Sequence, residues 1–110
     1  MKNIMNTMNL VKKAQEVQSE IVAIQKQLAE QSVTGRASNG AVQVTMTAKM
    51  APQSVKIQPD LLKQVDAETL EDLILVALKD AKNAADNALT EAYSDLKKRY
   101  NLPDNFDMFS

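Results

Sequence analysis

The sequence contains no cysteine and no histidine. The lack of cysteine excludes disulfides and thiolate chemistry, and it fits a reducing cytosol. The lack of histidine removes the usual general base and the commonest metal ligand. The two glycines, Gly35 and Gly40, fall in an expected strand and turn, and they cannot form a phosphate-binding loop. We therefore expect a protein that is not an enzyme and that takes no metal, cofactor or small-molecule substrate.

Long apolar runs are also absent. The longest, residues 73–78, has six residues, whereas a membrane-spanning helix needs about 20. The polar residues after Met1 lack the apolar segment of a secretory signal. We expect a cytoplasmic protein that does not bind membranes.

The charge shows no overall excess of one sign, because 13 basic residues face 14 acidic ones. The distribution is uneven, however: residues 1–60 carry a net +3 and residues 61–110 a net −4. A local basic patch is therefore compatible with the net charge of −1.

The first 31 residues have the pattern of a long amphipathic helix, expected over residues 3–31. Apolar residues recur every three or four positions, which is typical of a heptad seam. Such a seam either packs inside the chain or pairs with a second copy. We favour self-association, because one hairpin cannot easily cover so long a stripe. The seam and the dimer core are expected to comprise Leu10, Ala14, Val17, Ile21, Ile24 and Leu28, with Val42 and Val44 from the sheet.

Three short strands are expected next, over residues 33–37, 41–47 and 53–58. Apolar and polar residues alternate in the second and third strands, so one face of the sheet is buried and the other is polar. Asn39-Gly40 is a favoured turn because both residues tolerate a positive φ. Residues 59–62 are expected to form a helical turn that begins at Pro59.

A second long helix is expected over residues 66–100, with Asp66 as its N-cap. Its apolar face is rich in alanine, and we expect these small residues to allow close packing against the first helix. Asn101 and Pro103 end the helix. The tail, residues 101–110, carries Phe106 and Phe109 and is expected to dock on the domain.

Together these elements predict one α+β domain over residues 1–110, in the order α-β-β-β-α. Each long helix spans about 45–50 Å at ~1.5 Å per residue. A compact chain of this length has a radius of gyration of only about 13 Å. The helices must therefore project or pair with a second copy, which predicts an elongated homodimer.

The residues that point to a function are basic. If the two long helices are antiparallel, the start of the first and the end of the second share one tip. Lys97-Lys98-Arg99 is also explained as a basic last turn that complements the helix dipole. In a dimer, two such tips would contact DNA mainly at phosphates, with little sequence information. The candidate DNA-binding residues at this tip are Lys2, Lys12, Lys13, Lys97, Lys98 and Arg99.

The order and spacing of several short motifs resemble the YbaB/EbfC family of bacterial nucleoid-associated proteins. These motifs are Gln27-Leu28-Ala29-Glu30, Val33-Thr34-Gly35, Gly40-x-Val42-x-Val44, Val55-x-Ile57-x-Pro59-x-Leu61-Leu62, Leu70-Glu71-Asp72-Leu73, Asp80-Ala81 and Leu102-Pro103…Phe106…Phe109. The resemblance implies a tweezer-like homodimer that binds duplex DNA in the nucleoid with little or no sequence preference.

The chain departs from the family pattern at two places. Residues 48–51 lack the glycine usual between the second and third strands, which affects turn geometry. Gln53-Ser54 stands where many members have a basic residue, which argues against a cationic contact from the sheet and favours the helix tips. The alternative function is a structural or adaptor dimer that binds another protein, through the polar strand face or the helix seam.

Overall fold

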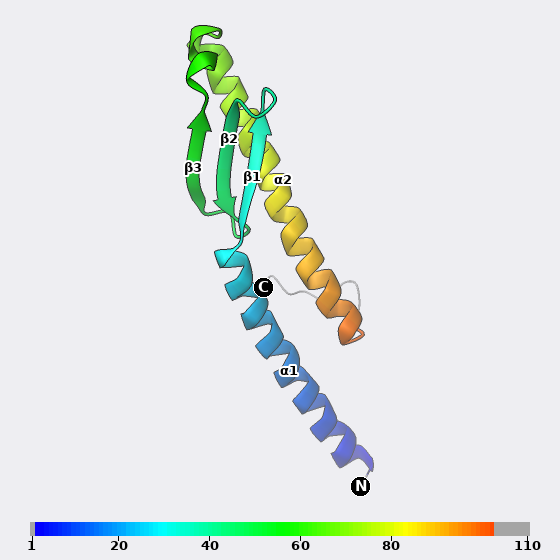
Figure 1. Cartoon of the computed structure of the whole chain (residues 1–110). Coiled ribbons are helices and arrows are strands. Elements are labelled where there is room, and N and C mark those ends of the chain that lie inside the picture. Colours follow the sequence, from blue (N-terminus) through cyan, green and yellow to red (C-terminus); the bar gives the residue numbers. More distant parts are fainter. Residues whose placement is uncertain (1, 103–110) are drawn as a thin grey trace. The chain divides into compact units, whose positions relative to one another are not determined.

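The computed structural model describes the backbone of residues 2–102 and the side chains of residues 7–102. The order of elements confirms the α-β-β-β-α prediction (Figure 1). Each element begins and ends within one residue of the range expected from the sequence, and the predicted tail from Pro103 onward lies outside the described residues. The elements are α1 (Lys2–Glu30), β1 (Ser32–Ala37), β2 (Val42–Thr47), β3 (Pro52–Ile57), a 3-10 helix η1 (Pro59–Lys63) and α2 (Ala67–Arg99).

Packing divides the chain into two compact units. The sheet unit is Leu28–Leu89, and it holds the three strands and the first part of α2. The helical unit is Met1–Gln27 together with Thr90–Ser110, and its described part is built from most of α1 and the end of α2.

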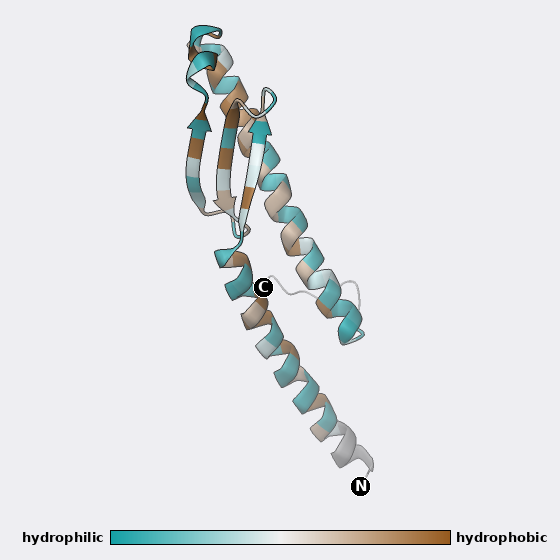
Figure 2. Cartoon of the chain, in the orientation of Figure 1, coloured by the Kyte–Doolittle hydropathy of each residue, from teal (hydrophilic) through white to brown (hydrophobic). Residues whose placement is uncertain are grey.

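The strands of the sheet unit form an antiparallel sheet in the order β1-β2-β3. The β1–β2 turn confirms the expected Asn39-Gly40 signal, since φ is +57° at Asn39 and +89° at Gly40. Hydrophobic and hydrophilic residues alternate along the strands (Figure 2). Because successive side chains point to opposite faces, this alternation gives the sheet one apolar and one polar face.

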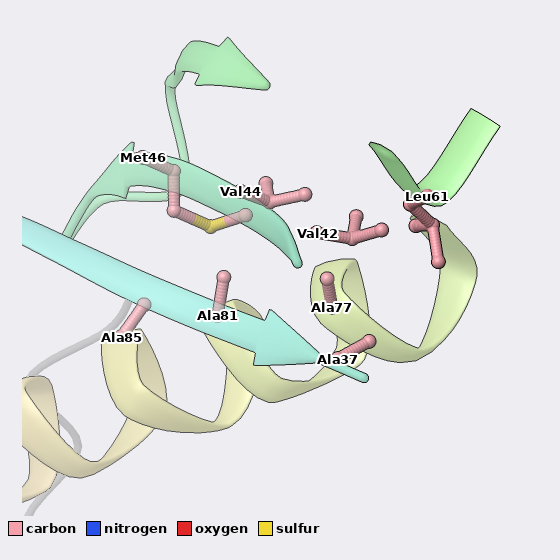
Figure 3. Close-up of a cluster of buried hydrophobic side chains, with 8 residues drawn as sticks. All are labelled: Ala37, Val42, Val44, Met46, Leu61, Ala77, Ala81 and Ala85. Atoms are coloured by element: carbon pink, nitrogen blue, oxygen red, sulfur yellow. The ribbon is translucent and has the colours of Figure 1, made fainter. Parts of the chain in front are cut away.

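The apolar face packs on α2. Figure 3 shows Ala77, Ala81 and Ala85 of α2 directed toward the side chains of β1 and β2. Val42 and Val44, which the sequence placed in the core, are both buried. The full buried cluster is Ala37, Val42, Val44, Met46, Leu61, Ala77, Ala81 and Ala85.

The alanine stripe of α2 therefore packs on the sheet at these three positions, and the expectation that it faces the first helix is wrong there. The reason lies in Gly35 of β1. A Cβ placed on Gly35 would overlap the Ala77 carbonyl oxygen and the Ala81 amide nitrogen, and would lie 2.8 Å from the Cα of Ala81. The two backbones are in direct contact here, because glycine on the strand meets alanine on the helix.

The start of α2 confirms the N-cap prediction. The Thr69 amide donates a 2.8 Å hydrogen bond to Oδ1 of Asp66. Hydrogen bonding from the Thr69 side chain, together with this amide bond, favours the charged carboxylate and lowers the pKa of Asp66 from its ordinary value. The cap satisfies one of the amides that every helix start leaves without an intrahelical partner.

The turn between β2 and β3 places Met50 in the left-handed region, with φ at +68°. Hydrogen bonds hold the turn on both sides of this residue: Met50 N donates to the Thr47 carbonyl at 2.8 Å, and Ala51 N donates to Thr47 Oγ1 at 3.1 Å. The missing glycine at residues 48–51 thus leaves a side chain where the backbone favours glycine.

We predict that Gly35→Ala destabilises the protein by about 3 kcal/mol, because the new methyl group meets backbone atoms that no rotamer change can move. Urea denaturation of the wild type and the variant measures this loss. Arg36→Ala is the control, since the Arg36 side chain is exposed, and it should change stability by less than about 0.5 kcal/mol. Equal stabilities of the wild type and Gly35→Ala would refute the close contact.

We also predict that Met50→Gly stabilises the protein by roughly 0.5–1 kcal/mol. Relief of the left-handed conformation, about 1–2 kcal/mol, exceeds the entropy that glycine adds to the unfolded chain. Ala51→Gly is the matched control and should destabilise, because φ is not positive at Ala51. If thermal denaturation shows the same loss for both variants, the turn does not store this strain.

Candidate functional site

In the helical unit, α1 and the end of α2 run antiparallel. Two contacts establish the direction: Gln25 Nε2 donates to Tyr93 Oη at 2.8 Å, and Arg99 Nη2 donates to Glu20 Oε2 at 3.3 Å. From the first contact to the second, the residue number rises from 93 to 99 in α2 and falls from 25 to 20 in α1. The antiparallel pairing expected from the sequence is therefore present over this stretch.

The seam of α1 is buried only in part. Within the helical unit, Val17 and Ile24 are buried, Ile21 is half-buried, and Leu10 and Ala14 are exposed. Leu28, which belongs to the sheet unit, is also buried. The start of the seam thus remains open to solvent in the single chain.

Tyr93 and Leu96 of α2 are almost fully buried in the helical unit. Leu96 continues the apolar face of the second long helix, four residues after Ala92, whereas no expectation for Tyr93 came from the sequence. Its burial is compatible with its hydroxyl because Gln25 supplies a hydrogen bond. A tyrosine three residues before a buried leucine was the available signal, since residues three apart share a helix face.

The basic cluster at the end of α2 is partly paired. Arg99 Nε lies 3.1 Å from Asp95 Oδ2, and the guanidinium carbon lies 5.9 Å from the centre of the Tyr100 ring. The hydrogen bond to Glu20, followed by the charges around it, raises the pKa of Arg99. Arg99 therefore links α2 to α1, while Lys98 is exposed beside it.

Lys12 and Lys13 lie nearer the N-terminus of α1 than Glu20, the residue that contacts the end of α2. Both are exposed and make no ion pair among the described residues. Glu20, which faces Arg99, is seven to eight residues away, or about 10–12 Å at the helical rise. The candidate cations therefore form two steps along the helix pair instead of one tip, and the side chain of Lys2 lies outside the described residues.

The two steps arise because most of α2 packs on the strands. Only its last part, Thr90 to Arg99, belongs to the helical unit, whereas α1 contributes nearly all of its length. Leu102, just after α2, lines an apolar hollow on α1 together with Lys13 and the seam residues Leu10, Ala14, Val17 and Ile21.

The three strands carry two cations that lie outside the candidate DNA-binding residues named from the sequence. Arg36 of β1 and Lys56 of β3 are both paired with Gln43 of β2 in the strand register, so the three share one row on the polar face. The sequence has no basic residue at Gln53-Ser54, where many family members have one, and so it carried no expectation of a cationic sheet. The signal that was available is the alternation itself, which puts Arg36 and Lys56 on the same face as Gln43.

The described residues offer little other chemistry. No group of three or more metal-ligating side chains occurs among them. No helix between Lys2 and Arg99 is long and apolar enough to cross a membrane.

Comparison with known proteins identifies the family. Residues 1–99 match the YbaB/EbfC DNA-binding family. The chain belongs to this family. It is 42% identical over 103 residues to a nucleoid-associated protein of Paramagnetospirillum magneticum, covering 94% of this chain and 96% of the relative. A nucleoid-associated protein of Bradyrhizobium sp. is 38% identical over 99 residues, covering 90% and 93%.

A solved structure supports the fold of this YbaB/EbfC family member. The crystal structure of an uncharacterized protein from Helicobacter pylori, HP0035, superposes with a TM-score of 0.68 at 17% identity, and the match covers 79% of this chain and 91% of the other. The resemblance inferred from the sequence motifs is thus confirmed by the family match, and the fold by the structural one.

Proposed function

We propose that this chain is a non-catalytic, homodimeric protein of the bacterial nucleoid that binds duplex DNA mainly through phosphate contacts, with little sequence specificity. The family assignment carries the DNA-binding part of the proposal. The names of the relatives, which are nucleoid-associated proteins, support the location. Phosphate contact is supported by the type of residue available, because lysine and arginine neutralise phosphates and a contact to phosphate carries no sequence information directly.

The unpaired lysines of α1 are the strongest candidates for phosphate contact. Lys12 and Lys13 are exposed and have no carboxylate partner among the described residues. Lys98 is exposed at the next step, beside Lys97. Arg99 forms ion pairs with Glu20 and Asp95, so we propose that its main role is to hold the end of α2 against α1.

Dimerisation is supported by apolar surface that the single chain leaves open. β3 is an edge strand, and its Val55 is 55% exposed although it lies on the apolar face of the sheet. Val55 and Leu78 line a groove of about 320 Å³ together with Val44, Pro52, Ile74 and neighbouring polar residues of β3. We call this surface the β3 groove. A second copy that presents the same groove about a twofold axis would cover both surfaces and protect the open strand edge.

For DNA binding, we predict that K12A/K13A and K97A/K98A/R99A each weaken binding to unrelated duplexes by roughly tenfold or more. Each lost phosphate contact should also flatten the plot of log K against log [salt] by about 0.9. Fluorescence anisotropy titrations over a range of salt measure both effects. The control is the triple variant K63A/K79A/K82A, which removes three charges from the sheet unit, as many as K97A/K98A/R99A removes and one more than K12A/K13A. Variants that bind like this control would show that the helix cations do not contact DNA.

For dimerisation, we predict that V55K/L78K converts a dimer into a folded monomer, because two charges in the β3 groove oppose its burial. Light scattering gives the mass in solution, and circular dichroism checks the fold. Val22→Lys introduces a charge at an exposed valine of α1 and should leave the dimer intact. A wild type with the mass of one chain would contradict dimerisation, and dissociation by Leu10→Lys alone would place the interface on α1.

A further inference from the structure

The polar face of the sheet is an organised surface. No helix or strand of the sheet unit covers it within the described residues, whereas α2 covers the opposite face (Figure 1). The strand register arranges its side chains in rows across the three strands. One row is Thr34, Thr45 and Ser54, and the next is Arg36, Gln43 and Lys56.

The first row consists of hydroxyl groups. Thr34 Oγ1 and Thr45 Oγ1 are hydrogen-bonded at 3.1 Å, and Ser54 at the end of the row is exposed. Beside this row, Ser32 Oγ donates to Gln53 Oε1 at 2.8 Å. Hydroxyl groups and side-chain amides are, with lysine and arginine, the groups that bind phosphate and sugar in protein–DNA complexes.

The second row carries positive charge without an acidic residue beside it on the strands. Arg36 and Lys56 are both exposed, and neither side chain forms an ion pair among the described residues. Their Cα atoms are two strand spacings apart, or about 10 Å. The three strands contain no Asp or Glu, although the chain as a whole has a net charge of −1. Asp80 of α2 accepts a hydrogen bond from the backbone amide of Arg36 at 2.9 Å, and no ion pair between their side chains occurs in the described part of the chain.

The surface is also hollowed at one end of this row. A hollow of about 330 Å³ is lined by residues of the β1–β2 turn, of β2 and of the end of β3: Gly40, Ala41, Gln43, Lys56, Ile57, Gln58 and Pro59. Gln43 Nε2 donates to the Gly40 carbonyl at 3.2 Å, which fixes the amide beside Lys56.

We propose that this face is a second DNA-binding surface, on which Arg36 and Lys56 bind two phosphates of a duplex backbone and the hydroxyl and amide groups between them bind sugar–phosphate oxygens. The inference rests on the proposed DNA-binding function and adds the sheet to the helix cations. Duplex DNA fits better than a single strand, because the strands have no aromatic residue on which bases could stack. Duplex DNA also fits this face better than a protein partner does, because protein interfaces usually contain apolar and aromatic anchor residues, which this face lacks.

The double variant R36Q/K56Q tests this surface. We expect its affinity for unrelated duplexes to fall roughly tenfold or more and the slope of log K against log [salt] to flatten by about 1.8, or 0.9 for each contact. The matched control is K63Q/K79Q, which removes the same charge from exposed positions of the same unit that lie off the polar face. R36K/K56R keeps both charges and should retain most of the affinity.

The outcomes separate this inference from the proposed function. If the wild type shows no salt-dependent binding to duplexes, both are wrong. If the wild type binds and K12A/K13A weakens binding while R36Q/K56Q matches K63Q/K79Q, only the sheet surface is wrong. Thermal denaturation of each variant checks the fold, which exposed side chains should leave intact.

Discussion

The contact between Gly35 and the backbone of α2 is the constraint on which the rest of the molecule depends. It brings a strand and a helix closer than any other residue on the strand would permit, with Ala77 and Ala81 on the helix side. Because the sheet and the helix meet at this distance, small side chains fill the layer between them. The contact also fixes which face of the sheet is covered, and so it leaves the row of Arg36, Gln43 and Lys56 on the open side.

The same packing determines how the charges of the helices are presented. Because most of α2 packs on the sheet, only the end of α2 packs against α1. Arg99 is engaged there by Glu20 and Asp95, and α1 continues past it with Lys12 and Lys13. An exposed ion pair of this kind contributes little stability, on the order of 0–1 kcal/mol. Its consequence is geometric, because it keeps the last turn of α2 against α1 while Lys98 stays exposed beside it.

The sequence is sufficient to predict the helices and strands, but it is not sufficient to predict how they pack on one another. Periodicities of two and of three to four residues are local, so they define the strands, the helices and the buried Val42 and Val44. The cap at Asp66 is equally local. Which element packs on the alanine stripe depends on tertiary packing, so only the structure shows that Gly35 of β1 contacts it. The row formed by Arg36 and Lys56 depends on strand register, which brings together residues 20 positions apart. Likewise, the two steps of helix cations depend on how much of α2 the sheet occupies.

These observations describe a scaffold whose cations face outward from two units and whose chemistry is suited to phosphates. The most direct test is a competition experiment in which unlabelled duplexes of equal length and unrelated sequence displace one labelled duplex from the wild-type protein at two salt concentrations. The account predicts that all duplexes compete equally within a few-fold, and that every affinity falls steeply at the higher salt. A duplex that competes at least 100-fold better than the others, or binding that salt leaves unchanged, would contradict it.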